Sequence, residues 1–396
     1  MENKWIRGAI PALFIHCCIG SVYCWSLLKF EIADTIGTSV SSIEIAFSLA
    51  IFFLGMSAAF GGRFVEKNVK MASLLSCICF SSGLLGSIYA INIGNTSLLL
   101  LFYGCIMGIG LGLGYLSPVK TLMLWFSEHK GLATGIAISG FGLSKALFSP
   151  FIVWCNNTYD VQHTLLYMAL ISIFFMLTAA VLIRKPLGWK EDMEKFSLRG
   201  AMKIILDPTY LKIWFIFYIN ITCGLALIAY EKDLGVESGI AFVGFLSSLT
   251  AIFNTLGRFG YSTASDWFTD KSRIYRMIFL SSVIAIVCNI GADSWATNWY
   301  WILVVVMLCI INAGYGGGFS TLPILLQSRF GMKQISMIHG FALSAWAWAG
   351  LSGNQLSNLI INRLGYDFDI LFVVLAALYA VAFLITISIK KPAQEI

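Results

Sequence analysis

The sequence predicts an all-α polytopic membrane protein, with twelve transmembrane helices in two parallel-related halves of six. Composition predicts the membrane class: 58% of the 396 residues are hydrophobic and 12% are charged, about half the charged share of a soluble domain. Apolar runs of about 20 residues, long enough to cross a bilayer as a helix, recur along the whole chain. The first run lacks a small-residue cleavage site, so we expect it to remain as a span.

The first six spans form the predicted N-terminal half. Their cores are residues 8–28, 44–62, 71–91, 98–126, 131–154 and 164–183. The first span holds His16, and the fifth holds Lys145. The fourth is rich in glycine, and a spacing of four residues puts Gly104, Gly108 and Gly112 on one face, where neighbouring helices can approach closely.

The last six spans form the predicted C-terminal half. Their cores are residues 211–230, 240–263, 275–292, 299–323, 336–361 and 368–389. One long polar segment, residues 184–210, separates the two sets of spans. We therefore predict an N-terminal six-helix half over residues 1–183, a cytoplasmic linker over residues 184–210, and a C-terminal six-helix half over residues 211–396.

The two halves carry traces of a repeat. A shift of 205 residues places Gly112, Pro118, Gly135 and Ala137 on Gly317, Pro323, Gly340 and Ala342. These positions lie in the fourth and fifth spans and in the tenth and eleventh. A parallel repeat of this kind is typical of transporters with two related bundles.

The distribution of basic residues predicts the orientation. If both termini lie in the cytoplasm, 20 of the 26 Lys and Arg residues fall on the cytoplasmic side and three on the outer side. Such an asymmetry favours a multi-pass protein of the cell membrane, inner or plasma, with both termini cytoplasmic. The apolar spans predict the lipid bilayer as a partner. No nucleic acid is expected as a partner, because the basic residues are spread over short loops.

Arg258 is the strongest candidate for a binding residue. It lies inside an otherwise apolar stretch, residues 239–263, and a charge at that depth costs at least about 2.5–3.5 kcal/mol. It precedes Asp266 by eight residues, which places it about 12 Å in from the cytoplasmic end of its helix. A guanidinium group can bind a carboxylate through two parallel hydrogen bonds. The alternative is a structural ion pair with an acid at the interface.

Lys145 and Lys120 are the two other basic residues within spans. Lys145 follows Lys130 by fifteen residues, so we place it about 22 Å from the cytoplasmic end, where it either faces a central cavity or snorkels outward. Lys120 is expected to reach the headgroups. No acidic residue falls deep in a predicted span, so water or substrate is expected to supply the counter-charge.

Further candidates line the expected cavity. Tyr23, Tyr115 and Trp346 carry aromatic rings that can enclose a small carboxylate and orient it through a hydroxyl or indole N–H. Asn254 lies one helical turn before Arg258, and Gln355 is a polar group of the eleventh span. His16 is either an intramembrane proton carrier or a structural histidine. The ten cysteines show no metal-site spacing with histidine, so no metal or other cofactor is expected.

Two loops resemble the loop signature of the major facilitator superfamily. Residues 61–70 read GGRFVEKNVK and residues 265–273 read SDWFTDKSR. The resemblance implies that Glu66 and Asp266, together with Lys67 and Arg273, belong to gating loops in which the acid caps a helix end and holds one conformation closed. Val69 stands where the signature has glycine.

Residues 104–150 are similar to the oxalate/formate antiporter branch of that superfamily, which includes monocarboxylate carriers. The segments GYLSPVKTLMLWF and KGLATGIAI carry the resemblance, with GSVYCWS at residues 20–26 and NTLGRFGYSTASD at residues 254–266. It implies that Arg258 is the anion-binding arginine. The lysine that oxalate-exchanging members have in the eleventh span is absent, but the shift of 205 places Lys145 on Gly350 in that segment.

The leading hypothesis is therefore a secondary active transporter of small organic anions, mono- or dicarboxylates. It would work as a monomer by alternating access, through anion exchange. The alternative is a proton-linked monocarboxylate symporter that uses His16 or a proton carried by the substrate. A non-transporting nutrient receptor on a carrier fold is a minor alternative. An enzyme is not expected, because no side of the membrane gathers acids, metal ligands or a nucleophile.

Overall fold

The computed structural model describes residues 3–189, 198–240, 243–296, 298–332 and 335–389, and every regular element in this part of the chain is helical. The first half contains η1 (Trp5–Ala9), α1 (Ile10–Ile19), η2 (Gly20–Leu27), α2 (Lys29–Ile36), α3 (Val40–Lys67), α4 (Val69–Asn92), α5 (Thr96–Leu99), η3 (Leu100–Met107), α6 (Gly108–Trp125), α7 (Lys130–Thr158) and α8 (Val161–Leu182). The remainder contains α9 (Leu198–Ile205), α10 (Pro208–Ala229), α11 (Glu231–Glu237), α12 (Val243–Ser265), α13 (Ser272–Val287), α14 (Ala292–Trp295), α15 (Tyr300–Phe330), α16 (Ile335–Ala342), α17 (Ser344–Asn358), η4 (Leu359–Arg363) and α18 (Phe368–Ile387).

Nine of the predicted spans are long and apolar enough to cross a membrane within the described residues. The other three depart from a uniform apolar helix. The eighth span, α12, carries a row of polar residues, and the ninth, α13, has only 16 residues. The eleventh is divided into α16, α17 and η4, so the prediction of one continuous helix over residues 336–361 is wrong in detail. Part of the predicted linker, residues 190–197, lies outside the described residues.

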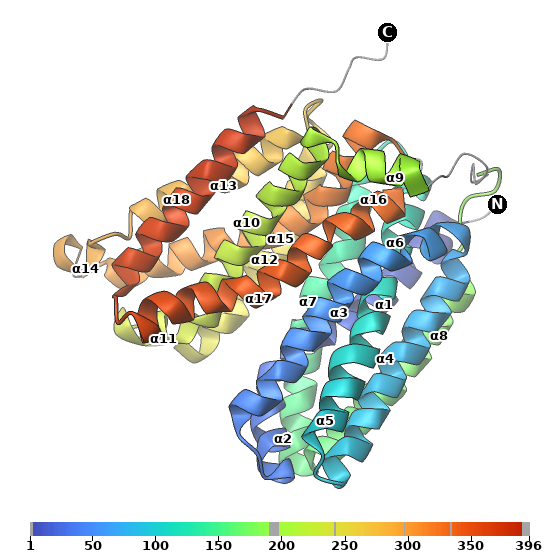
Figure 1. The fold of residues 1–396 in the computed structure, drawn as a ribbon, viewed down its shortest axis with the longest axis horizontal. Helices are drawn as coiled ribbons and strands as arrows, with labels where there is room; N and C mark the ends of the chain where they lie inside the picture. The colour runs from blue at the N-terminus through green and yellow to red at the C-terminus, as the bar shows by residue number, and fades with distance from the viewer. Residues whose placement is uncertain (1–2, 190–197, 241–242, 297, 333–334, 390–396) are drawn as a thin grey trace.

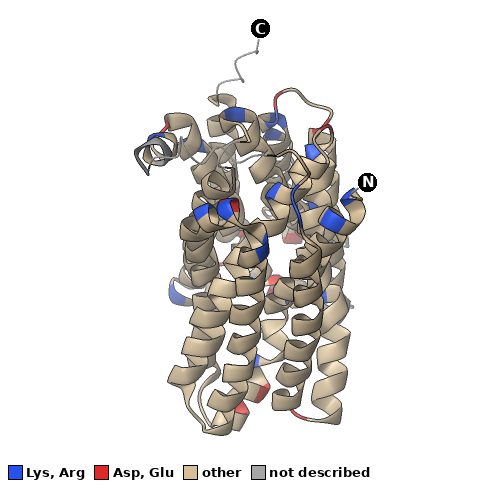
Figure 2. Ribbon diagram, turned by 90° about the vertical axis from the view of Figure 1, so that its right-hand side faces the viewer, with Lys and Arg blue, Asp and Glu red and all other residues tan. Residues whose placement is uncertain are grey.

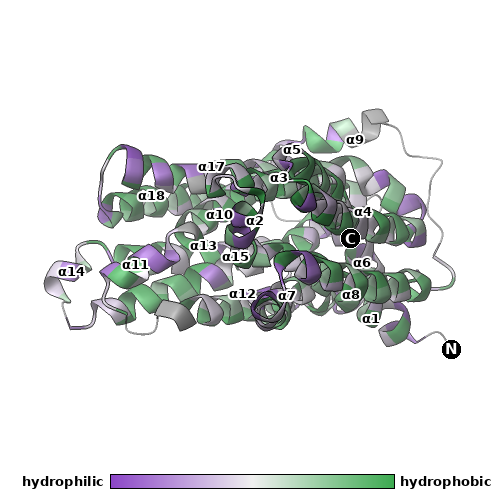
Figure 3. Cartoon of the chain, turned by 90° about the horizontal axis from the view of Figure 1, so that it is seen from below, coloured by the Kyte–Doolittle hydropathy of each residue, from purple (hydrophilic) through white to green (hydrophobic). Residues whose placement is uncertain are grey.

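The helices form two bundles, α1 to α8 and α10 to α18 (Figure 1). Both termini and α9 lie at one end of the molecule, here named the terminus end, and α2 and α11 lie at the opposite end, here named the far end (Figure 1). Lys and Arg residues gather toward the terminus end (Figure 2). Hydrophobic residues cover the sides of both bundles, and hydrophilic residues stand beside α2 and α11 (Figure 3). This is the pattern expected of helices that cross a bilayer.

The two bundles touch closely near the terminus end and diverge toward the far end (Figure 1). Glycine permits the close approach. A Cβ atom on Gly131 of α7 would lie 2.0 Å from the carbonyl oxygen of Ser262, and one on Gly340 of α16 would lie 2.1 Å from that of Ala58. Each pair joins one bundle to the other, so the terminus end is closed in this conformation.

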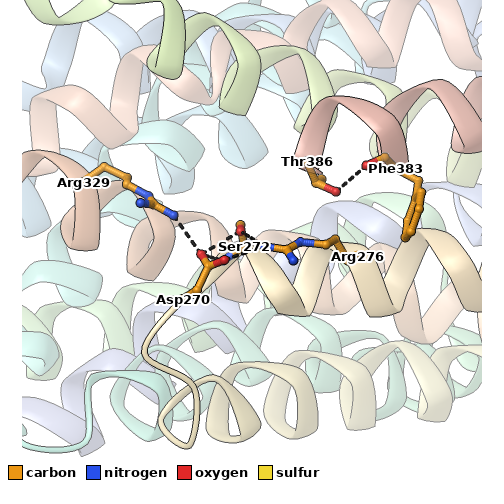
Figure 4. A network of polar contacts seen from close by, with 6 residues as sticks. All are labelled: Asp270, Ser272, Arg276, Arg329, Phe383 and Thr386. Atoms are coloured by element: carbon orange, nitrogen blue, oxygen red, sulfur yellow. Dashed lines mark hydrogen bonds and ion pairs between the residues drawn. The ribbon is translucent and has the colours of Figure 1, made fainter. Parts of the chain in front are cut away.

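A buried polar network stabilises the terminus end of the second bundle (Figure 4). Asp270 accepts hydrogen bonds from the hydroxyl of Ser272 at 2.7 Å and from Arg329 at 2.8 Å, and it also pairs with Arg276. Burial alone would raise the pKa of Asp270, but the hydrogen bonds from Ser272 and the charges of Arg276 and Arg329 outweigh it and lower that pKa. The carboxylate thus joins α13 to α15.

Asp270→Asn is expected to lower the free energy of unfolding by about 3 kcal/mol or more, because it leaves the buried Arg329 without its acid. The folded-state pKa lies below that of the unfolded chain, about 3.9. The stabilisation is therefore complete above that value and is lost as the pH falls through the folded-state pKa. Thermal unfolding in detergent across this pH range checks both statements. Asp293→Asn, at an exposed far-end position, is the control and should change neither.

Candidate anion-binding site

A row of polar residues runs along one face of α12. Thr250, Asn254, Arg258, Ser262 and Asp266 follow one another at intervals of four residues, the last just beyond the helix end, and are named here the polar stripe. Residues four apart lie above one another on a helix. The stripe faces α7 of the other bundle: a Cβ on Gly142 would lie 3.2 Å from the Arg258 side chain, and one on Gly135 would lie 2.6 Å from the Ser262 hydroxyl.

The stripe places Arg258 between the two bundles. Its side chain is 1% exposed, and its Nε donates a hydrogen bond to Asn254 at 2.8 Å. The guanidinium group lies over the ring of Phe141 at 5.7 Å and over that of Phe319 at 5.2 Å. Its Nη1 is buried and has no hydrogen-bond partner among the described residues. A buried charged donor without an acceptor is costly, so this nitrogen is a candidate contact for an anion.

Six aromatic residues surround Arg258 and are named here the aromatic cage: Tyr23, Tyr115, Phe141, Tyr315, Phe319 and Trp346. The two bundles contribute three each. The rings of Phe319 and Trp346 lie 4.5 Å apart, and the hydroxyls of Tyr23 and Tyr315 lie 3.4 Å apart. The buried hydroxyl of Tyr115 has no partner among the described residues. Together these groups can surround a small planar anion and donate hydrogen bonds to it.

The structure brings four of the predicted residues to Arg258: Tyr23, Tyr115, Asn254 and Trp346. Phe141, Tyr315 and Phe319 were not predicted. Phe141 carried a signal, because the shift of 205 that relates the halves aligns it with Trp346. The predicted Gln355 is exposed on α17, whereas Trp346 is buried.

Lys145 lies near Arg258 but outside the aromatic cage. It follows Gly142, which touches Arg258, by three residues, so its backbone lies about 4.5 Å further along α7 toward the far end. The side chain is partly buried and makes no hydrogen bond or ion pair with the described residues. The two cations therefore stand about one helical turn apart along the interface.

A buried carboxylate that the sequence did not reveal lies close to Lys145. Glu231, the first residue of α11, is 5% exposed and accepts a hydrogen bond from the Thr250 hydroxyl at 2.8 Å. Burial raises the pKa of Glu231, while the bond from Thr250 and the nearby charge of Lys145 lower it. Glu231 lies at a helix end, as expected, and no ion pair joins it to Lys145 among the described residues. The expectation that water or substrate alone supplies the counter-charge is wrong for Lys120, which pairs with Glu66.

His16 is fully buried against Tyr115, with ring centroids 5.3 Å apart. One ring nitrogen, Nε2, lies 3.2 Å from the backbone oxygen of Tyr115, and the other, Nδ1, has no partner among the described residues. His339 approaches Tyr115 from the other bundle at 5.9 Å. These two histidines border the aromatic cage on its terminus side.

The two predicted gating acids both cap helices of the opposite bundle. Glu66 accepts a hydrogen bond from the backbone N–H of Ser336 at 2.7 Å. Asp266 accepts from the N–H groups of Gly131 at 2.8 Å and Leu132 at 3.0 Å. A carboxylate is stabilising at a helix N-terminus, where N–H groups lack partners and the helix dipole is positive.

The basic residues of the gating loops behave differently from the acids. Lys67 and Arg273 are exposed. Lys120, which was expected to snorkel to the headgroups, is instead 3% exposed and forms a buried ion pair with Glu66. That prediction is wrong because an acid on the neighbouring α3 provides a closer partner than the headgroups. Within the described residues, no group of His, Cys, Asp or Glu side chains could hold a metal ion.

Comparison with known proteins places this architecture among transporters. The family model of the Major Facilitator Superfamily matches residues 10–354. The oxalate:formate antiporter of Oxalobacter formigenes is 25% identical over 393 residues, which cover 96% of this chain and 91% of that protein. Monocarboxylate transporter 13 of Rattus norvegicus is 28% identical over 273 residues, which cover 63% of this chain and 60% of that protein.

A solved structure shares the fold. The crystal structure of the transporter FucP in its outward conformation superimposes with a TM-score of 0.74 over 96% of this chain and 98% of that chain, at 13% sequence identity. The likeness extends over both bundles, so the twelve-helix arrangement in two halves holds for the whole chain.

Proposed function

The chain belongs to the Major Facilitator Superfamily, and we propose that within this family of transporters it carries small organic anions, mono- or dicarboxylates, by alternating access. The observation that carries this proposal is the buried Nη1 of Arg258, which has no acceptor among the described residues and lies inside the aromatic cage. A carboxylate is the ligand that a guanidinium fork binds best. The similarity to an antiporter of oxalate and formate and to a monocarboxylate transporter supports the same substrate class.

We propose exchange as the mode of transport. An empty site should reorient slowly, because moving the uncompensated charge of Arg258 through a site of low polarity is costly. A bound anion neutralises Arg258 and removes that barrier. The second candidate, proton-linked symport of a monocarboxylate, has one observation in its favour: Nδ1 of His16, beside the aromatic cage, has no hydrogen-bond partner within the described ranges.

Counterflow in proteoliposomes tests the proposal. Vesicles are loaded with formate, acetate, lactate, pyruvate, oxalate or malonate, and uptake of the labelled anion is followed. Exchange predicts uptake only when an internal anion is present, and symport predicts uptake driven by an imposed proton gradient into empty vesicles. Absence of any carboxylate flux would overturn the proposed function and favour a receptor on a carrier fold.

We place the terminus end in the cytoplasm, in the inner or plasma membrane of the cell. Because the bundles are joined at that end and diverge at the far end, the conformation described here would then face outward. Reporter fusions placed after residue 389 and within the linker at residue 188 are expected to report the cytoplasm. A signal from the outer side at either position would reverse the orientation.

Lys145→Ala is expected to impair transport of dicarboxylates more than that of monocarboxylates. Arg258 alone can neutralise one carboxylate, whereas a second negative group needs the second cation, and a charge-assisted hydrogen bond contributes about 1.5–3 kcal/mol. The ratio of oxalate or malonate uptake to lactate uptake measures the effect. A lysine that only snorkels to the membrane surface predicts an unchanged ratio.

A further inference from the structure

Glu231 combines three properties that neither the gating loops nor the anion site require of it. It is an acid 5% exposed, it is the first residue of the short helix α11, and it is held against the polar stripe by Thr250. A buried carboxylate is costly unless it is paired. The hydrogen bond from the Thr250 hydroxyl offsets only a small part of the cost of burying a full negative charge. A nearby cation would therefore stabilise the Glu231 carboxylate.

The cation that we consider as a partner for Glu231 is Lys145, which belongs to the other bundle. A Cβ on Gly142 of α7 would lie 2.8 Å from the hydroxyl of Thr255 of α12. Lys145 lies three residues further along α7 and Thr250, which holds Glu231, lies five residues earlier on α12, so both lie on the far-end side of this contact. Lys145 itself makes no hydrogen bond or ion pair with the described residues. The two residues therefore belong to different bundles, on α7 and α11, and the bundles diverge toward the far end, where α11 lies (Figure 1).

We propose that Glu231 determines substrate charge selectivity, by competing with the second negative group of the substrate for Lys145 when the far end closes. The proposal rests on the carboxylate transport proposed above. With a monoanion on Arg258, closure joins Lys145 to Glu231, and every charge has a partner. With a dianion, the substrate occupies Lys145, and Glu231 is left buried without a cation. Glu231 therefore favours monoanions, and Lys145 favours dianions.

Replacing Glu231 and replacing Lys145 are expected to change the ratio of dianion to monoanion transport in opposite directions. A purely structural role of either residue would not produce this pattern. Glu231→Gln removes the competitor, keeps an acceptor for Thr250, and is expected to raise the ratio of malonate to lactate transport about fivefold or more, the lower end of typical coupling between two sites. Lys145→Gln is expected to lower that ratio. The double variant Lys145→Gln/Glu231→Gln should behave as Lys145→Gln does, because Glu231 acts only through the lysine.

Competition between labelled lactate and unlabelled malonate in proteoliposomes measures these ratios, as KM and as maximal rate for each substrate. Glu237→Gln is the matched control, since it removes the same charge from the exposed face of the same helix, and its ratio should equal that of the unchanged protein. An unchanged ratio in Glu231→Gln, while the unchanged protein transports carboxylates, would refute the proposal and leave the proposed function standing.

A second measurement does not depend on transport. Cysteines replace Lys145 and Glu231, a protease site is inserted in the linker, and an oxidant is added to membranes. A disulfide holds the two halves together on a denaturing gel after cleavage until a reductant is added. We expect this bond for the pair at positions 145 and 231, and not for the control pair at positions 145 and 237. No bond at position 231, or equal bonding at both positions, would overturn the closure of Glu231 onto Lys145.

Discussion

Replacing Arg258 by lysine is expected to reduce carboxylate affinity about ten- to hundredfold and to lower transport accordingly. Lysine keeps the charge but loses the planar fork. In the structure Nε of that fork donates to Asn254, while Nη1 has no hydrogen-bond partner in the described part of the chain, and a single ammonium group cannot reproduce both directions. Loss of one charge-assisted hydrogen bond costs about 1.5–3 kcal/mol, which corresponds to the stated range in affinity.

Uptake of labelled lactate and of labelled oxalate by Arg258→Lys in proteoliposomes measures this loss. Arg363→Lys is the matched control, because Arg363 is an exposed arginine at the end of η4 and has no role in the proposed site or the gating loops, and it should transport as the unchanged protein does. Normal transport by Arg258→Lys would contradict the assignment of Arg258 as the carboxylate ligand, whatever the behaviour of the other candidates.

Asp266→Ala is expected to shift the protein toward a conformation open at the terminus end. The Asp266 carboxylate and the N–H groups of Gly131 and Leu132 belong to different bundles, so their hydrogen bonds exist only while that end is closed. Charge-assisted bonds of this kind contribute about 1.5–3 kcal/mol. The open population should rise about tenfold or more, since each 1.4 kcal/mol changes an equilibrium constant tenfold.

Maleimide labelling of a cysteine at Ser336, which is buried at the contact between the bundles, measures the open population. Asp207→Ala is a matched control, because Asp207 caps α10 through Thr209 and Tyr210 of its own bundle. It removes the same type of contact without joining the two bundles, and it should leave the labelling rate unchanged. Equal labelling rates for the two variants would show that Asp266 does not hold the bundles together.

The sequence predicted Arg258 and its neighbours because their evidence is local. A charge in an apolar run must be buried or paired, and Asn254 follows from helical spacing alone. The repeat could also have predicted Phe141 as a site residue, because the shift of 205 aligns it with Trp346. By contrast, the partner of Lys120 could not be predicted: Glu66 precedes it by 54 residues, and only the packing of α3 on α6 brings the two side chains together.

Glu231 was missed for a different reason. Glu231 directly follows the predicted span over residues 211–230, and hydropathy predicts that water solvates an acid at such a position. In the structure α10 ends at Ala229, and α11 begins two residues later and holds Glu231 against Thr250. The burial of an acid at the edge of a span depends on how the next helix folds back, and hydropathy along the chain contains no such information. The break at Leu343 between α16 and α17 also escaped prediction, because residues 342–344 contain no glycine or proline that would mark it.

Arg258 lies at the middle of the polar stripe, so a tilt of α12 about this residue moves the two ends of the stripe in opposite directions. Thr250 and Asp266 each lie eight residues from Arg258, about 12 Å along a stiff rod on either side. A tilt of about 10° around Arg258 therefore moves the two ends by about 2 Å in opposite directions. A displacement of this size is enough to break the hydrogen bonds of Asp266, which are 2.8 and 3.0 Å long. The same tilt moves Thr250, which donates a hydrogen bond to Glu231. If the proposed anion binds at Arg258 and tilts α12, this single helix would move the contacts at both ends of the molecule together.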